Sequence, residues 1–150
     1  MSQIIVYMNF NGNCKEAMKF YQDCLGGELF LHSVGDSPMA SQMPAGEKDK
    51  ILHSKLEHDG ITLMGTDMVG PGGFIEGNTV SLMLDCSSEE EINKYFSALS
   101  SGGNVNMPLE KTFWAERFGA FTDKFGKSWM LNYDLDGKEQ PVAEQAAHAH

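Results

Sequence analysis

The side chains that could do acid, base or metal chemistry are few and scattered along the chain. The histidines outside residues 136–150 are His32, His53 and His58. His53 and His58 are five residues apart in one expected strand, so they point to opposite faces and cannot bind one metal ion together. A lone strand histidine is usually hydrogen-bonded or exposed, and among the three His53 is the candidate for lining a ligand site.

Two aspartates and two glutamates are the other candidates for acid–base work. Asp67 and Asp123 stand at the ends of apolar segments, where roles in turns and helix capping are commoner than catalysis. Glu110 and Glu116 flank the aromatic run at 112–114. Arg117 could pair with either glutamate or with the carboxylate of a ligand, because guanidinium binds carboxylates through two parallel hydrogen bonds.

The three cysteines, Cys14, Cys24 and Cys86, are predicted to be reduced thiols. Cys14 and Cys24 lie ten residues apart in one expected helix, about 15 Å along its axis, whereas a disulfide needs Cα atoms within about 7 Å. Cys14 in the first helical turn is a possible nucleophile, since a helix dipole favours the thiolate. No histidine stands near it in the sequence, so this alternative is the weaker one.

These residues are carried by two similar series of elements. An N-cap residue precedes each expected helix, Asn13 with Glu16 three residues on and Ser88 with Glu91. The same seven and eight residues separate each cap from an aromatic pair, Phe20–Tyr21 and Tyr95–Phe96. Each helix ends at a double glycine, 26–27 and 102–103, and each half later contains a Gly-x-x-[Leu/Trp]-Met segment, at 60–64 and 126–130.

The repeated spacing predicts two βαβββ modules, at residues 1–68 and 78–135, in one α+β domain of residues 1–135. In the first module we expect strands at 4–10 and from residue 28, and a hairpin of 50–58 with 61–67, which turns at Asp59–Gly60. Residues 35–49 are predicted to form a long mobile loop. Residues 136–150 are polar and unpatterned, and we expect a frayed tail there.

Composition narrows the class of partner. The chain has 150 residues, 41% apolar, and a net charge of −10. Such a charge repels phosphate backbones and anionic lipids, so neither nucleic acid nor a membrane is an expected partner. No apolar run approaches the roughly 20 residues that span a bilayer, and the first residues lack the pattern of a signal peptide. We therefore expect a cytoplasmic protein.

Three segments carry a family resemblance: FNGNCKEAMKFYQDCLGGEL at 10–29, ILHSKLEHDGITLMGTD at 51–67 and EKTFWAERFGAFTDKFGKSWMLN at 110–132. They resemble the PhnB-like branch of the vicinal-oxygen-chelate superfamily, which includes glyoxalase I, extradiol dioxygenases and bleomycin-resistance proteins. The resemblance implies a glyoxalase-like cup of mixed sheet with the helices outside, and a homodimer. Members of this branch are often labelled demethylubiquinone methyltransferase-like, but no strand-to-helix turn here has the glycine-rich loop that a methyl-donor nucleotide usually needs.

Metal-dependent members of that superfamily place ligands on the first and last strands of each module. The resemblance puts these positions at Val6 and Met64, and at 79–81 and Met130. Valine cannot bind a metal, and thioethers suit only soft ions such as Cu(I). We therefore predict no metal and no cofactor.

The resulting prediction is a protein that binds a small organic ligand in an apolar cup, with no catalytic residue assigned. Methionine is flexible and polarisable and would accommodate varied ligands, although filling the core is an equally good interpretation. The predicted ligand-binding residues are Val6, Met8, His53, Met64, Met83, Trp114 and Met130. The alternative is a metal-dependent lyase, isomerase or dioxygenase of the glyoxalase type, with its ligands relocated to His53, Asp67 and Glu110 or Glu116.

Overall fold

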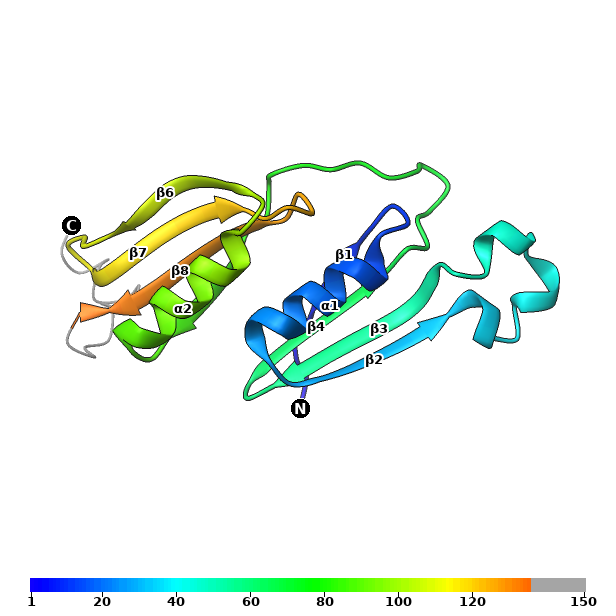
Figure 1. Cartoon of the computed structure of the whole chain (residues 1–150), viewed down its shortest axis with the longest axis horizontal. Coiled ribbons are helices and arrows are strands. Elements are labelled where there is room, and N and C mark those ends of the chain that lie inside the picture. The colour runs from blue at the N-terminus through cyan, green and yellow to red at the C-terminus, as the bar shows by residue number, and fades with distance from the viewer. Residues whose placement is uncertain (136–150) are drawn as a thin grey trace. The chain divides into compact units, whose positions relative to one another are not determined.

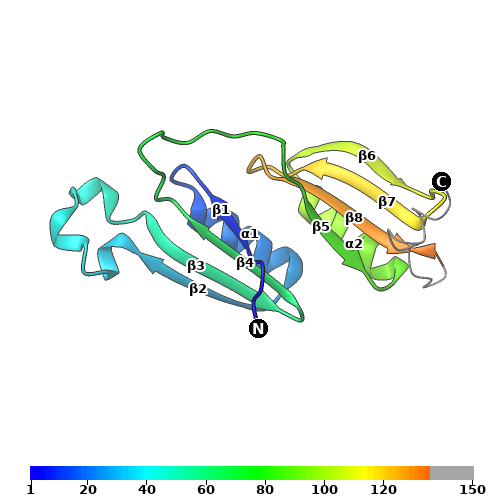
Figure 2. The same cartoon turned by 180° about the vertical axis from the view of Figure 1, so that it is seen from behind.

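The computed structural model describes residues 1–135, and the predicted tail at 136–150 lies outside them. The chain divides into two compact units, Met1–Glu76 and a second one that begins at Gly77. Each unit contains one four-stranded sheet and one α-helix (Figures 1 and 2). Among the described residues, no helix is long and apolar enough to cross a membrane.

The first unit is one βαβββ module. Its elements are β1 (Val6–Asn9), α1 (Cys14–Leu25), β2 (Glu28–Ser33), β3 (Ile51–His58) and β4 (Ile61–Thr66). The strand order is β1-β4-β3-β2, in which β1 runs parallel to β4 and the other neighbours are antiparallel. The β3–β4 hairpin turns at Asp59 and Gly60, which both have positive φ, as the Asp-Gly pair predicts.

The second unit repeats this plan. Its elements are β5 (Leu82–Cys86), α2 (Glu89–Ser100), β6 (Asn104–Glu110), β7 (Ala115–Thr122) and β8 (Ser128–Asp134). The order β5-β8-β7-β6 again pairs the first and last strands in parallel. The two βαβββ modules and the α+β class that the sequence predicts are thus confirmed.

Each sheet is covered by its own helix on one face only. In the first unit Ala17, Met18 and Tyr21 of α1 are fully buried against the sheet, and in the second unit Ile92 and Leu99 of α2 are. Figure 2 shows each sheet in front of its helix. The opposite side of each sheet carries no helix of its own unit, and we call it the open face.

The two helices begin differently. Ser88 caps α2 as predicted, since its Oγ accepts a hydrogen bond from the Glu91 amide at 3.1 Å. The Glu91 carboxylate in turn accepts from the Ser87 amide at 3.1 Å. The predicted capping box at Asn13 is wrong, because the Asn13 side chain makes no cap hydrogen bond. A carboxylate from β4 takes that role, as described below.

The double glycines after the helices allow the backbone to approach a strand closely. A Cβ atom on Gly27 would lie 2.2 Å from the carbonyl oxygen of Glu57, and one on Gly103 would lie 2.2 Å from that of Thr122. Gly27 also has a φ of +99°, which side chains rarely tolerate. The repeated glycines therefore do more than end the helices: they let the chain turn tightly against the sheet.

Residues 34–50 connect β2 to β3, where a long loop at 35–49 is predicted. They contain the short 3₁₀ turns η1 (Val34–Asp36), η2 (Ala40–Gln42) and η3 (Ala45–Glu47). Val34 is fully buried, and its amide donates to the Lys50 carbonyl at 2.8 Å. The Ser37 hydroxyl donates to the Val34 carbonyl at 2.7 Å. Local hydrogen bonds that the sequence pattern does not reveal thus give this segment regular turns.

Candidate functional site

Strand register decides which residues share the open face of the first sheet. In the parallel pairing of β1 with β4, Tyr7 lies opposite Met64 and Val6 opposite Leu63. Leu63 is 4% exposed and Met8 is 6% exposed, both in the core under α1. Val6 and Met8 therefore belong to the helix side, and the expectation that they share a face with Met64 is wrong. The apolar segment IIVYM leaves the two parities of β1 nearly indistinguishable, and a slip of one residue exchanges the faces.

Tyr7 is the residue that occupies the position expected for Val6. Its side chain is 50% exposed, and its hydroxyl lies 3.4 Å from Nδ1 of His53. The two rings stack with centroids 5.9 Å apart. His53 and Met64 are thus on the open face with Tyr7, which the sequence analysis did not select. The parallel pairing of β1 with β4 puts Tyr7 opposite Met64, so a correct strand register would have identified Tyr7.

A second histidine joins this face. His32 of β2 lies directly opposite His53 of β3, and its Nε2 is 3.2 Å from the Asp36 carbonyl oxygen. A carbonyl only accepts, so Nε2 of His32 carries the hydrogen. Phe30, two residues earlier, is 56% exposed and pairs with Lys55. The open face of the first sheet therefore carries aromatic rings, with imidazole groups that can exchange hydrogen bonds.

The second sheet presents methionines at the corresponding place. Met83 of β5 lies opposite Met130 of β8, as Tyr7 does opposite Met64 in the first sheet. Met83 is 58% exposed. Residues 79–81, near which the resemblance places an inherited metal position, precede β5 and are not part of the sheet. Met83 and Met130 are hence brought together on one face, next to each other.

Trp114 borders the same face from the segment before β7. Its ring contacts that of Phe118, with centroids 5.3 Å apart and an edge-to-face angle of 67°. Phe118 lies opposite Asn132 of β8. Because Asn132 and Met130 are two residues apart on one strand, they share a face. Trp114 thus reaches the open face through Phe118, at the end away from Ser128.

A polar cluster that the sequence analysis missed lies beside these side chains. The Asn132 amide nitrogen donates to Asp85 Oδ1 at 3.0 Å and to Asp134 Oδ1 at 2.9 Å. Asn132 is only 4% exposed. Asp85 and Asn132 are partners in the β5–β8 register, and Asp134 follows two residues on. That i, i+2 spacing in the last strand was the available signal.

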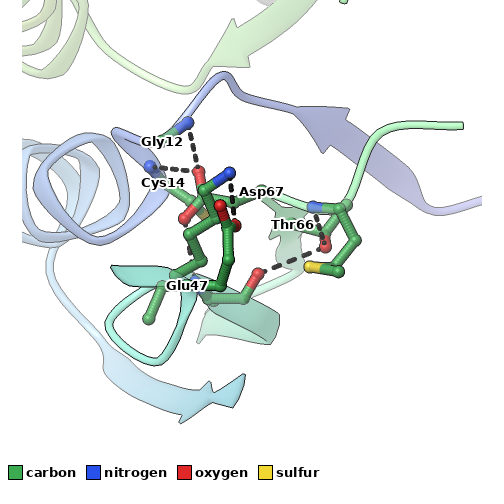
Figure 3. A network of polar contacts seen from close by, with 8 residues as sticks. Gly12, Cys14, Glu47, Thr66 and Asp67 are labelled. Atoms are coloured by element: carbon green, nitrogen blue, oxygen red, sulfur yellow. Dashed lines mark hydrogen bonds and ion pairs between the residues drawn. The ribbon is translucent and has the colours of Figure 1, made fainter. Parts of the chain in front are cut away.

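Asp67 is a structural carboxylate. Its Oδ1 accepts from the amides of Gly12 at 2.9 Å and Cys14 at 3.0 Å, and its Oδ2 accepts from the amide of Ile51 at 2.8 Å. Figure 3 shows these bonds converging on the side chain, with Thr66 beside it. The carboxylate therefore caps α1 from the end of β4 and fastens the start of β3. Turn and capping roles, the commoner interpretation of Asp67, account for its contacts.

Asp123 is similarly engaged. Its Oδ1 accepts from the amides of Phe125 and Lys127 at 2.8 and 3.0 Å, and its Oδ2 accepts from Nε1 of Trp129 at 2.8 Å. The side chain is 3% exposed. It organises the β7–β8 turn and anchors a core tryptophan, so its contacts too are those of a turn residue.

The charged residues around the aromatic run pair elsewhere. Arg117 Nη2 lies 2.8 Å from Glu89 Oε1 of α2, on the helix side of the sheet. Glu116 lies 3.8 Å from Lys111. Arg117 forms its ion pair with neither Glu110 nor Glu116, the partners considered from the sequence.

The inherited metal positions do not suit a divalent ion. Met64 and Met130 lie beside Tyr7 and Met83, which supply thioethers and a phenol in place of the imidazoles and carboxylates that zinc, nickel or magnesium prefer. Within residues 1–135 no group of three or more His, Cys, Asp or Glu side chains is arranged to hold a metal ion. Of the relocated candidates, Asp67 already binds three amides, whereas His53 lies against Tyr7.

The thiols offer no accessible nucleophile. Cys14, Cys24 and Cys86 are all free and buried. Cys14 is fully shielded, with its Sγ 3.5 Å from the Ser54 hydroxyl. Burial, assisted by the nearby Glu91 and Asp85 carboxylates, raises the pKa of Cys86 to about 12. A thiolate nucleophile at neutral pH is therefore unsupported.

The strand-to-helix turns are also closed to anionic cofactors. A nucleotide site at such a turn uses backbone amides at a helix N-terminus. Here the Asp67 carboxylate occupies the amides of Gly12 and Cys14, and the Glu91 carboxylate occupies that of Ser87. Both turns therefore present engaged amides and a carboxylate, which suits neither a phosphate nor another anion.

Comparison with known proteins gives consistent matches. Residues 2–132 match the family model described as 3-demethylubiquinone-9 3-methyltransferase. Protein YjdN of Escherichia coli K12 is 35% identical over 145 residues, which cover 91% of this chain and 96% of YjdN.

Solved structures agree with the fold. Protein PA1353 from Pseudomonas aeruginosa is 43% identical with a TM-score of 0.80, covering 89% of this chain and 98% of that one. A PhnB protein from Bacillus cereus is 26% identical with a TM-score of 0.68, covering 88% and 99%. A glyoxalase/bleomycin resistance protein/dioxygenase from Nocardioides, 20% identical with a TM-score of 0.59 and covering 95% and 90%, shares the fold.

Proposed function

We propose a function for this chain, which belongs to the PhnB-like 3-demethylubiquinone-9 3-methyltransferase family. The chain binds a small organic molecule on an open sheet face without a divalent metal ion. The main observation in support is that large apolar side chains are exposed on the open faces of the two sheets. Tyr7, Phe30, Met83 and Met107 are 50%, 56%, 58% and 49% exposed. Register puts Met107 opposite Ala120 and hence on the face of Met130.

Exposed apolar side chains that gather on one face of a sheet indicate a surface that something covers. An outer sheet face that only meets water normally alternates to polar residues. Here the outer positions are aromatic rings, thioethers and a few polar groups, namely His53 in the first sheet and Asn132 in the second. That mixture of apolar surface with a few polar groups is typical of small-molecule sites.

Ligand binding without a divalent metal is supported by the side chains at the inherited positions. Met64 and Met130 can contact an apolar ligand but are poor partners for zinc or nickel. A lyase or dioxygenase with relocated metal ligands is less well supported, because both carboxylate oxygens of Asp67 accept hydrogen bonds from backbone amides of its own unit.

We also propose that the protein is a cytoplasmic homodimer. Three free, buried thiols suit a reducing compartment, and the net charge of −10 argues against a nucleic acid partner.

Phe113 is 90% exposed beside Trp114, as expected for a ring that a second copy covers. Sedimentation equilibrium at micromolar concentration should give twice the 16.5 kDa chain mass, and Phe113→Glu should restore the single mass. A wild-type chain that sediments as one copy would refute the dimer.

A thermal-shift screen on dialysed, chelator-treated protein tests the binding proposal. A ligand at a hundredfold excess over Kd stabilises the folded chain by about 2.7 kcal/mol. We expect a hit whose effect is lost on Tyr7→Lys or Met83→Lys, which place a charge on an open face. Val80→Lys, at a site that is 76% exposed and precedes β5, is the matched control and should keep the effect. Ligands that bind only after a metal is restored, or that ignore both open-face variants, would contradict the proposal.

A further inference from the structure

One atom on the open face of the second sheet lacks a hydrogen-bond partner. Among the described residues, Oδ1 of Asn132 is the buried side-chain oxygen or nitrogen with none. The side chain is 4% exposed, so water does not easily replace a donor there. Buried polar atoms in native proteins are almost always satisfied, and an unsatisfied one calls for an explanation.

The orientation of the Asn132 amide is fixed by its neighbours. Its nitrogen donates to Asp85 at 3.0 Å and to Asp134 at 2.9 Å. Rotating the amide by 180° would set its carbonyl oxygen against two carboxylates, which only accept hydrogen bonds when ionised. Both N–H groups of the Asn132 amide therefore donate to the two aspartates, and its oxygen Oδ1 is the atom without a donor.

One carboxylate of the same cluster has no cationic partner among the described residues. Two carboxylates share one neutral amide, and Asp85 forms no ion pair in the part of the chain that the structure describes. The guanidinium of the same unit, that of Arg117, pairs with Glu89 on the helix side. Asp85 is exposed and shares the face of Met83, two residues before it.

We propose that Asp85, Asn132 and Asp134 receive the cationic N–H group, an ammonium or a guanidinium, of the molecule that binds on this face. Such a group gives the Asp85 carboxylate an opposite charge and supplies the hydrogen-bond donor that the Asn132 amide oxygen lacks. Met83 and Met130 provide the adjoining surface for an apolar part of the same molecule. Because Oδ1 is shielded, the donor reaches it with a shift of the surrounding side chains. This inference rests on the proposed function and names the ligand class.

Three probes of similar shape test the charge requirement: phenethylammonium, 2-phenylethanol and 3-phenylpropionate. They share a phenyl ring, and the group at the other end is cationic, neutral and anionic, respectively. Binding is followed in ¹H–¹⁵N spectra through the side-chain amide signal of Asn132, identified by its loss in Asn132→Asp. We expect phenethylammonium to shift this signal and to bind at least about tenfold more tightly than either other probe, as a charge-assisted hydrogen bond implies.

Asp85→Asn removes one charge at an exposed position and should leave the fold intact. It should weaken phenethylammonium binding about tenfold or more. Glu90→Gln is the matched control, since it makes the same charge change at an exposed site on α2. Its Kd should stay within about twofold of the wild type, because α2 covers the opposite face of the sheet and the charge of an exposed side chain is screened by salt.

The outcomes separate this inference from the proposed function. Equal binding of phenethylammonium and 2-phenylethanol on the open face would overturn the inference and leave small-molecule binding standing. Equal effects of Asp85→Asn and Glu90→Gln would overturn it as well. Failure of all three probes to perturb any open-face residue would count against both. Saturable binding of Ca²⁺ or Mg²⁺ at the Asn132 signal, with no response to phenethylammonium, would reassign the cluster to a metal and refute an organic cation.

Discussion

Replacing Asp67 with asparagine should destabilise the first unit strongly although the two side chains have nearly the same shape. The carboxylate accepts three backbone hydrogen bonds at 2.8–3.0 Å and is 5% exposed. Asparagine keeps one oxygen for the amides of Gly12 and Cys14 but presents an NH₂ group to the amide of Ile51. Two donors then face each other in a buried place.

The magnitude follows from these contacts. A hydrogen bond to a charged group contributes about 1.5–3 kcal/mol to stability, and a negative charge at a helix N-terminus adds about 0.5–1 kcal/mol. Asp67→Asn should therefore lower the free energy of unfolding by about 2–4 kcal/mol, and Asp67→Ala, which removes all three bonds, by somewhat more. That is a large fraction of the roughly 5–15 kcal/mol that holds a domain folded.

Urea unfolding followed by far-UV circular dichroism measures the loss. Tryptophan fluorescence is less suitable, because Trp114 and Trp129 both belong to the second unit. Asp23→Asn, the same substitution at an exposed position of α1, is the control and should change stability by less than about 0.5 kcal/mol. If Asp67→Asn is no more destabilising than Asp23→Asn, the assignment of Asp67 as the cap of α1 is wrong.

Further predictions concern the backbone, a thiol and a cap. Gly27→Ala should lower the free energy of unfolding by more than about 2 kcal/mol, because its Cβ would meet the Glu57 carbonyl, whereas Gly46→Ala, in open space, should be neutral in the same urea unfolding. Above pH 9 the unfolded Cys86 thiol ionises while the folded one, with its pKa near 12, stays protonated, so stability should fall as pH rises towards 12. The stability of Cys86→Ala should fall less steeply with pH, and parallel stability curves for the variant and the wild type would refute this. Ser88→Ala should lower the free energy of unfolding by about 1 kcal/mol, and no change would exclude the cap.

Features set by local sequence were predictable. Ser88 with Glu91, the Asp59–Gly60 hairpin and the paired glycines are decided within a few residues, and the structure shows each of them. Asn13 failed as a cap because a distant carboxylate, Asp67, fills the same position with a full charge. No window of neighbouring residues reveals that competition.

The candidate site was less predictable because it depends on which face each strand presents. In β5 and β8 the methionines alternate with core residues, so strand parity predicts that Met83 and Met130 lie on open-face positions, as the register has them; their role in binding stays a prediction. In β1 the resemblance put the inherited position at Val6, and the consecutive apolar residues gave no sign that Tyr7 presents the open face. The Asp85–Asn132–Asp134 cluster needs the parallel β5–β8 register, which joins residues 47 positions apart.

Methionine methyl signals test the central claim, ligand binding on an open face without metal, most directly. The chain has ten methionines, with Met64, Met83 and Met130 on the open faces. Met8 of β1 and Met18 of α1, both buried between the helix and the first sheet, are the internal controls. In chelator-treated protein labelled with [¹³C-methyl]methionine, a hit from the thermal screen should shift at least one open-face signal and leave Met8 and Met18 unchanged. Shifts confined to Met8 and Met18, or shifts that appear only after a divalent metal is added, would contradict the account.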